Sequence, residues 1–545
     1  MSIWVVICAA LVCFWVAKVL IWVWWKPRKL EKLLREQGFN GTSHMYMFGD
    51  LKQLVSTTKK ARSKPIELSH SIVPRVFPFI QETIQRQGPM SYIWFGVTPR
   101  VNILDPDLIK DVLSNKFGHF SKIKVNPLLR LLAQGVANYD GEKWAKHRRI
   151  ISPAFHLEKL KLMVPAFHAS CIDLVEKWEK LVSNGSSEVD VWPDLQELTA
   201  DAISRTAFGS SYEKGRRIFQ LQTEQIKLVL EVLPFVFIPG FRYTKSRFKS
   251  SLVLVQVLPM YQRQVVYMNL ILCRFLPTKK NRRIKEIDRE VRSILSDMIN
   301  YREKATKNGE LAHTNDLLGM LLDCNRKHTQ ENDNSKKFGM AIEDVIEECK
   351  LFYIAGQETT SSLLVWTMVV LSMHPEWQAR AREEVLRVFG SDKPNLDALS
   401  HLKIVTMIFY EVLRLYPPAA LLLRYCYKEM KLGYLTLPPG VEIAIPTILV
   451  HHDRTIWGKD AEEFNPMRFS EGISKVTNNQ VSFFPFGWGP RICLGQAFSL
   501  IEAKMAIAMI LQRFSFELSP TYAHAPYTLL TLRPQYGAQM ILNKL

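Results

Sequence analysis

The chain has 545 residues, 8 cysteines and a formal net charge of +19. Its length allows one large catalytic unit or several domains, and no repeat or low-complexity linker divides it. The cysteines form no CxxC pair and no framework spacing, which argues against a disulfide-rich secreted protein and predicts reduced thiols facing the cytosol. The basic residues are scattered without a nucleic-acid motif, so the charge favours an anionic membrane surface or an acidic protein partner.

Residues 2–25 are almost wholly apolar, interrupted only by Lys18. That length suffices for one helix across a bilayer, and the segment lacks the basic start and the small-residue cleavage site of a signal peptide. Tryptophans close the segment and basic residues follow at once, so the positive-inside tendency places the rest of the chain in the cytosol. We therefore expect a transmembrane anchor at 2–25, a basic linker at 26–50 and one catalytic domain at 51–545.

Two short elements are predicted in the first third of the chain. Alternating apolar and polar residues at 89–104 predict strands joined by a turn at 98–100. A helix is predicted to open at Gly141, with Trp144 and Arg148 four residues apart on one face. An indole N–H and a guanidinium on one side can clamp an anion, although such a pair is more often a surface cation–π contact.

A long helix is predicted at 342–373, with the sequence AGQETT at 355–360 in its middle. Gly356 and the hydroxyls that follow are expected to loosen the helical ladder and open a local groove. Glu358 and Thr359 supply an acid and a hydroxyl that can pass protons there. The alternative is a polar kink in a core helix.

Glu411 and Arg414 lie three residues apart on an otherwise apolar helix, so they face the same side. Both charges need partners if they are buried. Prolines at 417–418 end that helix, and an apolar run at 419–423 leads to Arg424.

The stretch 483–495 reads FFPFGWGPRICLG and places Cys493 just before a predicted helix at 496–514. Backbone N–H groups at a helix N-terminus favour the thiolate, and Arg491 adds a permanent cation two residues away. The glycines permit a close-lying backbone around the sulfur. Such a thiolate can bind a metal; the alternative is a buried cysteine beside a glycine-rich turn.

Phe486, Arg491 and Cys493, together with the glycines of 487–495, resemble the haem-binding loop of the cytochromes P-450. The resemblance implies a mainly α fold with small β-sheets, haem b as the cofactor and Cys493 as the thiolate ligand of its iron. A thiolate ligand pushes electron density onto iron and favours O–O cleavage.

The resemblance also implies roles for residues far from this loop. Phe486 and Arg491 would contact haem, and three further residues would bind its propionates: Trp144, Arg148 and Arg424. Thr359 would hold water and hydroxyl where dioxygen is activated, and Glu358 would support proton delivery. A structural triad would consist of Glu411, Arg414 and Arg468, although Met467 stands where a glutamate is common. The apolar turns 421–423 and 528–532 are candidates for the substrate wall.

The motifs most resemble the plant secologanin synthase-like branch of the family, which implies oxidation of a terpenoid at the endoplasmic reticulum membrane. Electrons would come from NADPH through NADPH-cytochrome P-450 reductase, with cytochrome b5 as a further candidate partner. Basic residues at 143–149 would form a docking site for such an acidic partner, or merely a solvated face. Two alternatives stay open: a reductase-independent haem-thiolate isomerase or dehydratase, and a non-catalytic haem-binding membrane protein.

Residues 242–273 contain five basic residues and no acidic one, and their two apolar runs interrupt the resemblance. Joining 238–241 directly to 274–279 would restore a run similar to a loop between two substrate-covering helices in plant members of the family. We interpret the segment as an insertion or a retained intron. The alternative is a membrane-dipping loop near the substrate entrance.

Overall fold

The structure is a computed structural model that describes residues 3–44, 48–115, 118, 120–123, 127–183, 185–209, 212–232, 279–308, 316–330 and 340–545. The segment 242–273 lies outside these ranges, so its interpretation stays a prediction.

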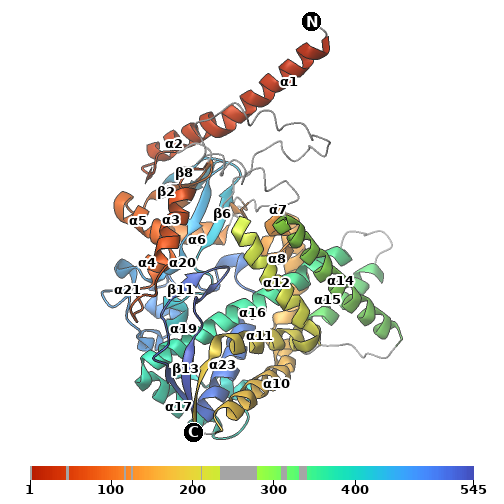
Figure 1. Cartoon of the computed structure of the whole chain (residues 1–545), viewed down its shortest axis with the longest axis vertical. Helices are drawn as coiled ribbons and strands as arrows, with labels where there is room; N and C mark the ends of the chain where they lie inside the picture. The colour runs from red at the N-terminus through yellow and green to blue at the C-terminus, as the bar shows by residue number, and fades with distance from the viewer. Residues whose placement is uncertain are drawn as a thin grey trace.

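Helices dominate the described chain, as expected, and form the body shown in Figure 1. The longer helices are α1 (Ile3–Leu20), α2 (Lys26–Glu36), α3 (Leu51–Ala61), α5 (Pro78–Gln87), α6 (Pro106–Ser114), α9 (Gly141–Ile151), α10 (Leu157–Leu181), α11 (Val191–Phe208), α12 (Tyr212–Val232), α14 (Lys279–Lys307), α15 (Leu317–Gln330), α16 (Ile342–Met373), α17 (Pro375–Phe389), α19 (Lys403–Leu415) and α23 (Gln496–Arg513). The short ones are α4 (Val73–Val76), α7 (Pro127–Arg130), α8 (Gly135–Asn138), α18 (Leu396–Leu399), α20 (Thr447–His451), α21 (Arg454–Trp457) and α22 (Ile473–Val476), with 3-10 turns at Ser152–Phe155, Pro466–Phe469 and Gly489–Arg491.

Among the described residues the strands form four small sheets, of which the largest has the order β1-β2-β3-β9-β6-β4. Its strands are β1 (Asn40–Gly41), β2 (Ser91–Phe95), β3 (Thr98–Asn102), β4 (Phe120–Ser121), β6 (Leu422–Cys426) and β9 (Glu442–Ile445). A second sheet joins β5 (Ser186–Asp190), β10 (Phe514–Leu518) and β13 (Gln539–Lys544), and two hairpins pair β7 (Met430–Leu432) with β8 (Leu435–Leu437) and β11 (Pro526–Thr528) with β12 (Leu532–Pro534).

The strands expected at 89–104 are present, but the turn expected at 98–100 is wrong. Residues 98–102 are strand β3, and the chain reverses at Gly96, whose φ is +67°. A positive φ suits glycine because it has no Cβ. Proline at 99 is tolerated in the strand, although it is more often found in turns.

Helix α16 crosses the middle of the body, where it packs against α11, α19 and α23. It is helical without a break through its AGQETT stretch, so the expected loosening of the ladder does not interrupt the helix. An added Cβ at Gly356 would lie 2.7 Å from Cγ1 of Ile203 in α11. Gly356 therefore allows the two helices to approach closely.

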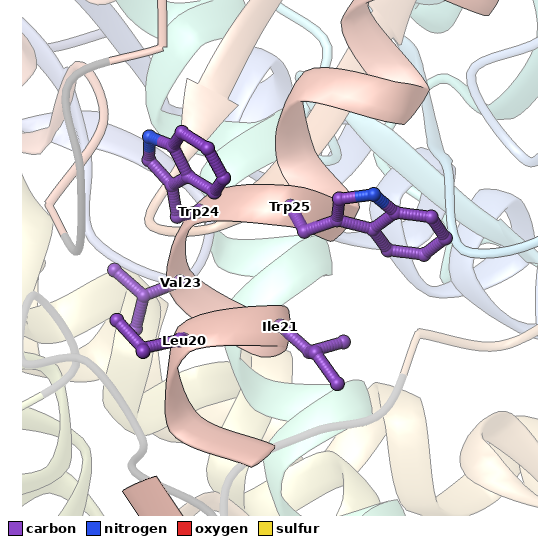
Figure 2. A pocket seen from close by; sticks show the side chains of 5 residues that line it. All are labelled: Leu20, Ile21, Val23, Trp24 and Trp25. Atoms are coloured by element: carbon purple, nitrogen blue, oxygen red, sulfur yellow. The ribbon is translucent and has the colours of Figure 1, made fainter. Parts of the chain in front are cut away.

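The N-terminal helix α1 extends away from the body (Figure 1), and the helical run Ile3–Glu36 is long and apolar enough to cross a membrane. A π-helical turn at Ile21–Trp25 ends its apolar part. Figure 2 shows Leu20, Val23 and Trp24 on one side of this turn and Ile21 and Trp25 on the other, around a shallow apolar hollow. Tryptophans at this position suit a membrane–water interface.

Within the stretch 26–50, expected to be a basic linker, the described residues 26–44 include elements that pack against the body. Helix α2 buries Leu30 and Leu34 in the core under the large sheet, and Phe39 joins the same cluster. Strand β1 then pairs in parallel with β2. The basic residues of α2 occupy its other face, so the charge pattern marks an amphipathic helix.

A buried ionic network joins α16 to α14 and to the segment before α9. Lys350 is fully buried, and its Nζ donates to Asp288 of α14 at 2.6 Å and to the carbonyl of Leu131 at 2.7 Å. Glu348 of the same helix accepts from the amide of Val136 at 3.0 Å and from His147 of α9 at 2.6 Å. These bonds fix the segment before α9 and thereby the helix that carries Trp144 and Arg148.

A cluster of histidines lies beside the loop before α4, and His70 and His524 in it are buried. His524 Nε2 lies 3.1 Å from the carbonyl of Ser69. His70 Nδ1 lies 2.9 Å from the Tyr416 hydroxyl, and its Nε2 lies 3.0 Å from Nε2 of His374. Burial is the main cause that lowers the pKa of His70 to about 3 and that of His524 to about 4. Both rings are therefore neutral in the folded protein at neutral pH.

The cluster predicts that the protein loses stability in acid. Below its ordinary pKa near 6.5, the unfolded His70 binds a proton that the folded form takes up only near pH 3, so stability falls as the pH drops between these values. For His70 the loss amounts to about 2 kcal/mol at about pH 5. His70→Gln should therefore flatten the pH dependence of the free energy of unfolding, measured by urea titration. The same substitution at exposed His401 should not, and an unchanged dependence in His70→Gln would contradict this assignment.

Candidate functional site

The cysteine loop, residues 483–495, is a tight turn held by its own backbone. The amide of Cys493 donates to the carbonyl of Phe486 at 2.9 Å. Gly489 has a φ of +70°, and a Cβ there would lie 2.8 Å from the carbonyl oxygen of Leu113. The predicted helix follows as α23, which begins at Gln496. The loop therefore presents the thiol at a helix N-terminus, as predicted.

The Cys493 side chain opens into a cavity of about 310 Å³. Its exposed surface faces this cavity, since the thiol lies deep within the protein. Burial raises the pKa of Cys493, against the smaller lowering effects of the Gly495 amide and Arg148. The amide of Gly495 and Arg148 thus favour the thiolate, as expected of a thiol at a helix N-terminus, but desolvation outweighs them in the protein alone.

Cations gather at one end of this cavity. Arg424 is 5% exposed, and burial together with nearby Arg491 lowers its pKa to about 10. Burial and the same arginines lower the pKa of Lys122 to about 7. Among these three cations, only Arg491 is paired with a carboxylate in the described chain, at 2.5 Å from Asp140. The cavity thus has an excess of positive charge that an anionic ligand would relieve.

Trp144 and Arg148 of α9 both line the cavity, as their spacing predicts. Arg148 Nη1 donates to the carbonyl of Ile492 at 2.7 Å, beside the cysteine. The indole of Trp144 packs under Arg491, whose Cζ lies 4.4 Å from the ring centroid. The cation–π contact considered as an alternative is therefore present with Arg491, and Trp144 still faces the cavity.

These residues fit haem. A thiol that opens into the cavity would be a suitable ligand for haem iron, Phe486 lines the wall beside it, and the excess of cations would suit two propionates. Cys493, Trp144, Arg148, Arg424, Phe486 and Arg491 all line this one cavity. The structure thus brings together every residue for which the resemblance implies contact with haem.

The polar residues 358–360 in the middle of α16 lie in two different environments. Thr359 and Thr360 line the cavity; Thr359 Oγ1 donates to the carbonyl of Ala355 at 2.7 Å, and Thr360 Oγ1 donates to Ser499 Oγ at 3.1 Å. Glu358 is 2% exposed and does not belong to the cavity lining. Successive residues of a helix point about 100° apart, which separates the acid from the hydroxyl.

Glu411 and Arg414 form a fully buried ion pair, as their spacing predicts. Arg414 Nε and Nη2 donate to the two oxygens of Glu411 at 2.8 and 2.7 Å. Arg414 Nη1 donates to the carbonyl of His451 at 2.8 Å. His451 Nε2 in turn accepts from the amide of Phe484 at 3.2 Å. This chain of bonds connects the ion pair to the cysteine loop.

Arg468 completes the predicted triad at longer range. Its Nε lies 3.6 Å from Glu411, while its Nη2 lies 2.6 Å from Asp460. Met467 points outward and is 46% exposed. Its sulfur lies 3.8 Å from Arg380 Nη2. A glutamate at this position, where the family commonly has one, would therefore lie on the surface beside Arg380.

Some parts of the cavity were not found from the sequence, and some predicted contacts are absent. Lys122 and Ser499 line it, but a single lysine or serine carries no signal of its own. Leu422 of the run 421–423 lines the cavity, whereas the turn 528–532 does not. In the basic stretch 143–149, Lys143 is paired with Asp344 at 2.7 Å, which reduces the charge available to a partner.

The environment of Met467 yields a stability prediction. Met467→Glu would place a carboxylate beside Arg380, and an exposed pair of this kind contributes about 0.2–1 kcal/mol. The thermal midpoint should rise at low salt and lose the gain at high salt. Met467→Gln, which has the shape without the charge, should show no salt-dependent gain. An equal rise in both variants would contradict the ion-pair explanation.

Comparison with known proteins agrees with this geometry. The family profile for cytochrome P-450 matches residues 74–541. Cytochrome P-450 CYP72A616 of Paris polyphylla is 56% identical over 526 residues, which cover 96% of this chain and 95% of that protein. Cytochrome P-450 72A15 of Arabidopsis thaliana is 53% identical over 538 residues, covering 98% of this chain and 97% of that protein. The chain therefore belongs to the cytochrome P-450 family of haem-thiolate monooxygenases.

Proposed function

We propose that Cys493 would supply the thiolate ligand of haem b and that the substrate is a plant terpenoid. The observation that carries the first part is the thiol opening into a cavity whose wall also holds unpaired cations. When bound, haem supplies the activation of dioxygen and the insertion of one oxygen atom into a C–H bond. The chain's own residues bind, orient and control protons around it.

The propionates would be held by Trp144, Arg148, Arg424 and Arg491, with Lys122 beside them. Burial lowers the pKa of Arg424 and Lys122 because it disfavours their charged forms, so pairing with an anionic propionate would stabilise them. Phe486 would pack beside the ring system. Glu411, Arg414 and Arg468 would act only by keeping the cysteine loop in shape.

Thr359 would handle protons inside the cavity. Its hydroxyl hydrogen is used by the carbonyl of Ala355, so its oxygen lone pairs remain free to accept a hydrogen bond from water in the cavity. Glu358 would support proton delivery from outside the lining.

The apolar lining of the cavity supports the proposal of a hydrophobic substrate. The apolar lining includes Val136, Phe155, Ile203, Leu351, Phe352 and Leu363, and an apolar cavity with few polar groups favours ligands such as terpenoids. NADPH-cytochrome P-450 reductase would supply electrons, with cytochrome b5 as a second partner. The apolar N-terminal helix would anchor the protein in the endoplasmic reticulum membrane, with the catalytic domain in the cytosol.

The proposed substrate class can be tested with microsomes that contain this chain and the reductase. A panel of terpenoids with NADPH should yield oxidised products, and the same microsomes without NADPH should yield none. Product formation without NADPH would favour the reductase-independent isomerase or dehydratase instead. Parallel expression without 242–273 would show whether that segment is needed.

Cys493→Ser should abolish both monooxygenation and the thiolate signature of the reduced, carbon monoxide-bound protein, because a serine hydroxyl does not replace the thiolate. Absorption spectra of the purified variant measure this directly. Cys426 is buried outside the cavity, and Cys426→Ala should keep the signature. A native spectrum in Cys493→Ser would refute the ligand assignment.

Thr359→Ala should lower the product formed per NADPH by roughly tenfold or more and release hydrogen peroxide in its place, because proton handling contributes at least that much. Product, NADPH and peroxide are measured together. Thr367 donates in the same way to Leu363 at 2.8 Å in the same helix, outside the cavity, so Thr367→Ala is the matched control. Tight coupling in Thr359→Ala would count against the proton role.

A further inference from the structure

Glu358 is held by a hairpin that the sequence separates from it by more than 170 residues. Its Oε2 accepts from Arg533 Nη2 at 2.5 Å and from Thr531 Oγ1 at 3.1 Å. The side chains of Arg533 and Glu358 are 7% and 2% exposed. The acid next to Thr359 thus forms a buried ion pair on a side of α16 that does not line the cavity.

The same hairpin is fixed to α16 at two further points. Ser362 Oγ and Trp366 Nε1 both donate to the carbonyl of Leu532, at 2.5 and 3.1 Å. Positions 358, 362 and 366 are spaced by four residues and lie on one helix face. The amide of Leu532 donates to the carbonyl of Pro418, which lines the cavity. Arg533 is therefore held rigidly between the helix and the cavity wall.

No other charged side chain contacts Glu358 in the described part of the chain. Thr531 is neutral, and Arg533 faces the ring of Trp192, with Cζ 5.9 Å from its centroid. Arg533 alone therefore compensates the charge of Glu358. A buried carboxylate that loses its cation favours the protonated form.

We propose that Arg533 is a positioning residue that pairs with Glu358 and keeps its carboxylate turned away from the cavity. Glu358 then takes part in proton delivery only after this ion pair opens, when the carboxyl group binds a proton from water and passes it toward Thr359. Closing of the pair restores the carboxylate. This inference rests on the proposed role of Glu358, and it adds the residue that sets when Glu358 is protonated.

The pH profile of product formed per NADPH tests the proposal. Glu358→Gln identifies the part of the profile that depends on Glu358, because that part should disappear. In Arg533→Gln the same part should move upward by about one pH unit or more, since an uncompensated buried carboxylate binds protons at higher pH. Arg533→Lys, which keeps the charge, should stay near the native profile. Arg513 is exposed at the end of α23, and Arg513→Gln is the control for loss of an arginine.

Thermal unfolding of the full-length protein supplies a readout that needs no turnover. Glu358→Gln, Arg533→Gln and the double variant should give midpoint shifts that do not add, with the double variant less destabilised than the sum of the two. Additive shifts or an unmoved profile in Arg533→Gln would overturn the proposal. Failure of the proposed function looks different: the native protein would form no product, and the unfolding cycle would still decide whether Arg533 holds Glu358.

Discussion

The buried ion pair between Glu411 and Arg414 is the interaction on which the cysteine loop depends. Both side chains are completely buried, and an isolated charge in such a place would be costly. The guanidinium of Arg414 has further donors beyond those paired with Glu411. Its Nη1 can donate to the carbonyl of His451 only if the chain around His451 keeps its observed position. Through His451 and Phe484 this constraint reaches the segment that presents Cys493.

Around that loop, burial disfavours the charged forms of the side chains that would bind haem. Burial raises the pKa of Cys493 and lowers those of Arg424 and Lys122. Each shift disfavours the charged form that would bind haem. An iron with two propionates supplies the opposite charges, so ligand binding and the electrostatic stability of the site should reinforce one another.

The sequence predicted the contacts that local spacing determines. The cysteine loop, the Trp144 and Arg148 pair and the Glu411 and Arg414 pair all lie where helical periodicity or turn chemistry placed them. Contacts between distant segments could not be predicted. Arg533 has no sequence relation to Glu358, and only the packing of the hairpin on α16 brings them together. The net rise in the pKa of Cys493 could not be predicted for the same reason, since desolvation depends on the whole fold.

We propose that the Glu411 and Arg414 pair keeps the cysteine loop ready to bind haem. The most direct test is the absorption spectrum of the reduced, carbon monoxide-bound Glu411→Gln variant. Glu463→Gln is the control, because the Glu463 side chain is exposed while its backbone carbonyl accepts from Arg414. We predict that Glu411→Gln loses the thiolate signature and retains little haem, whereas Glu463→Gln keeps both. A native spectrum and full haem content in Glu411→Gln would contradict the claim.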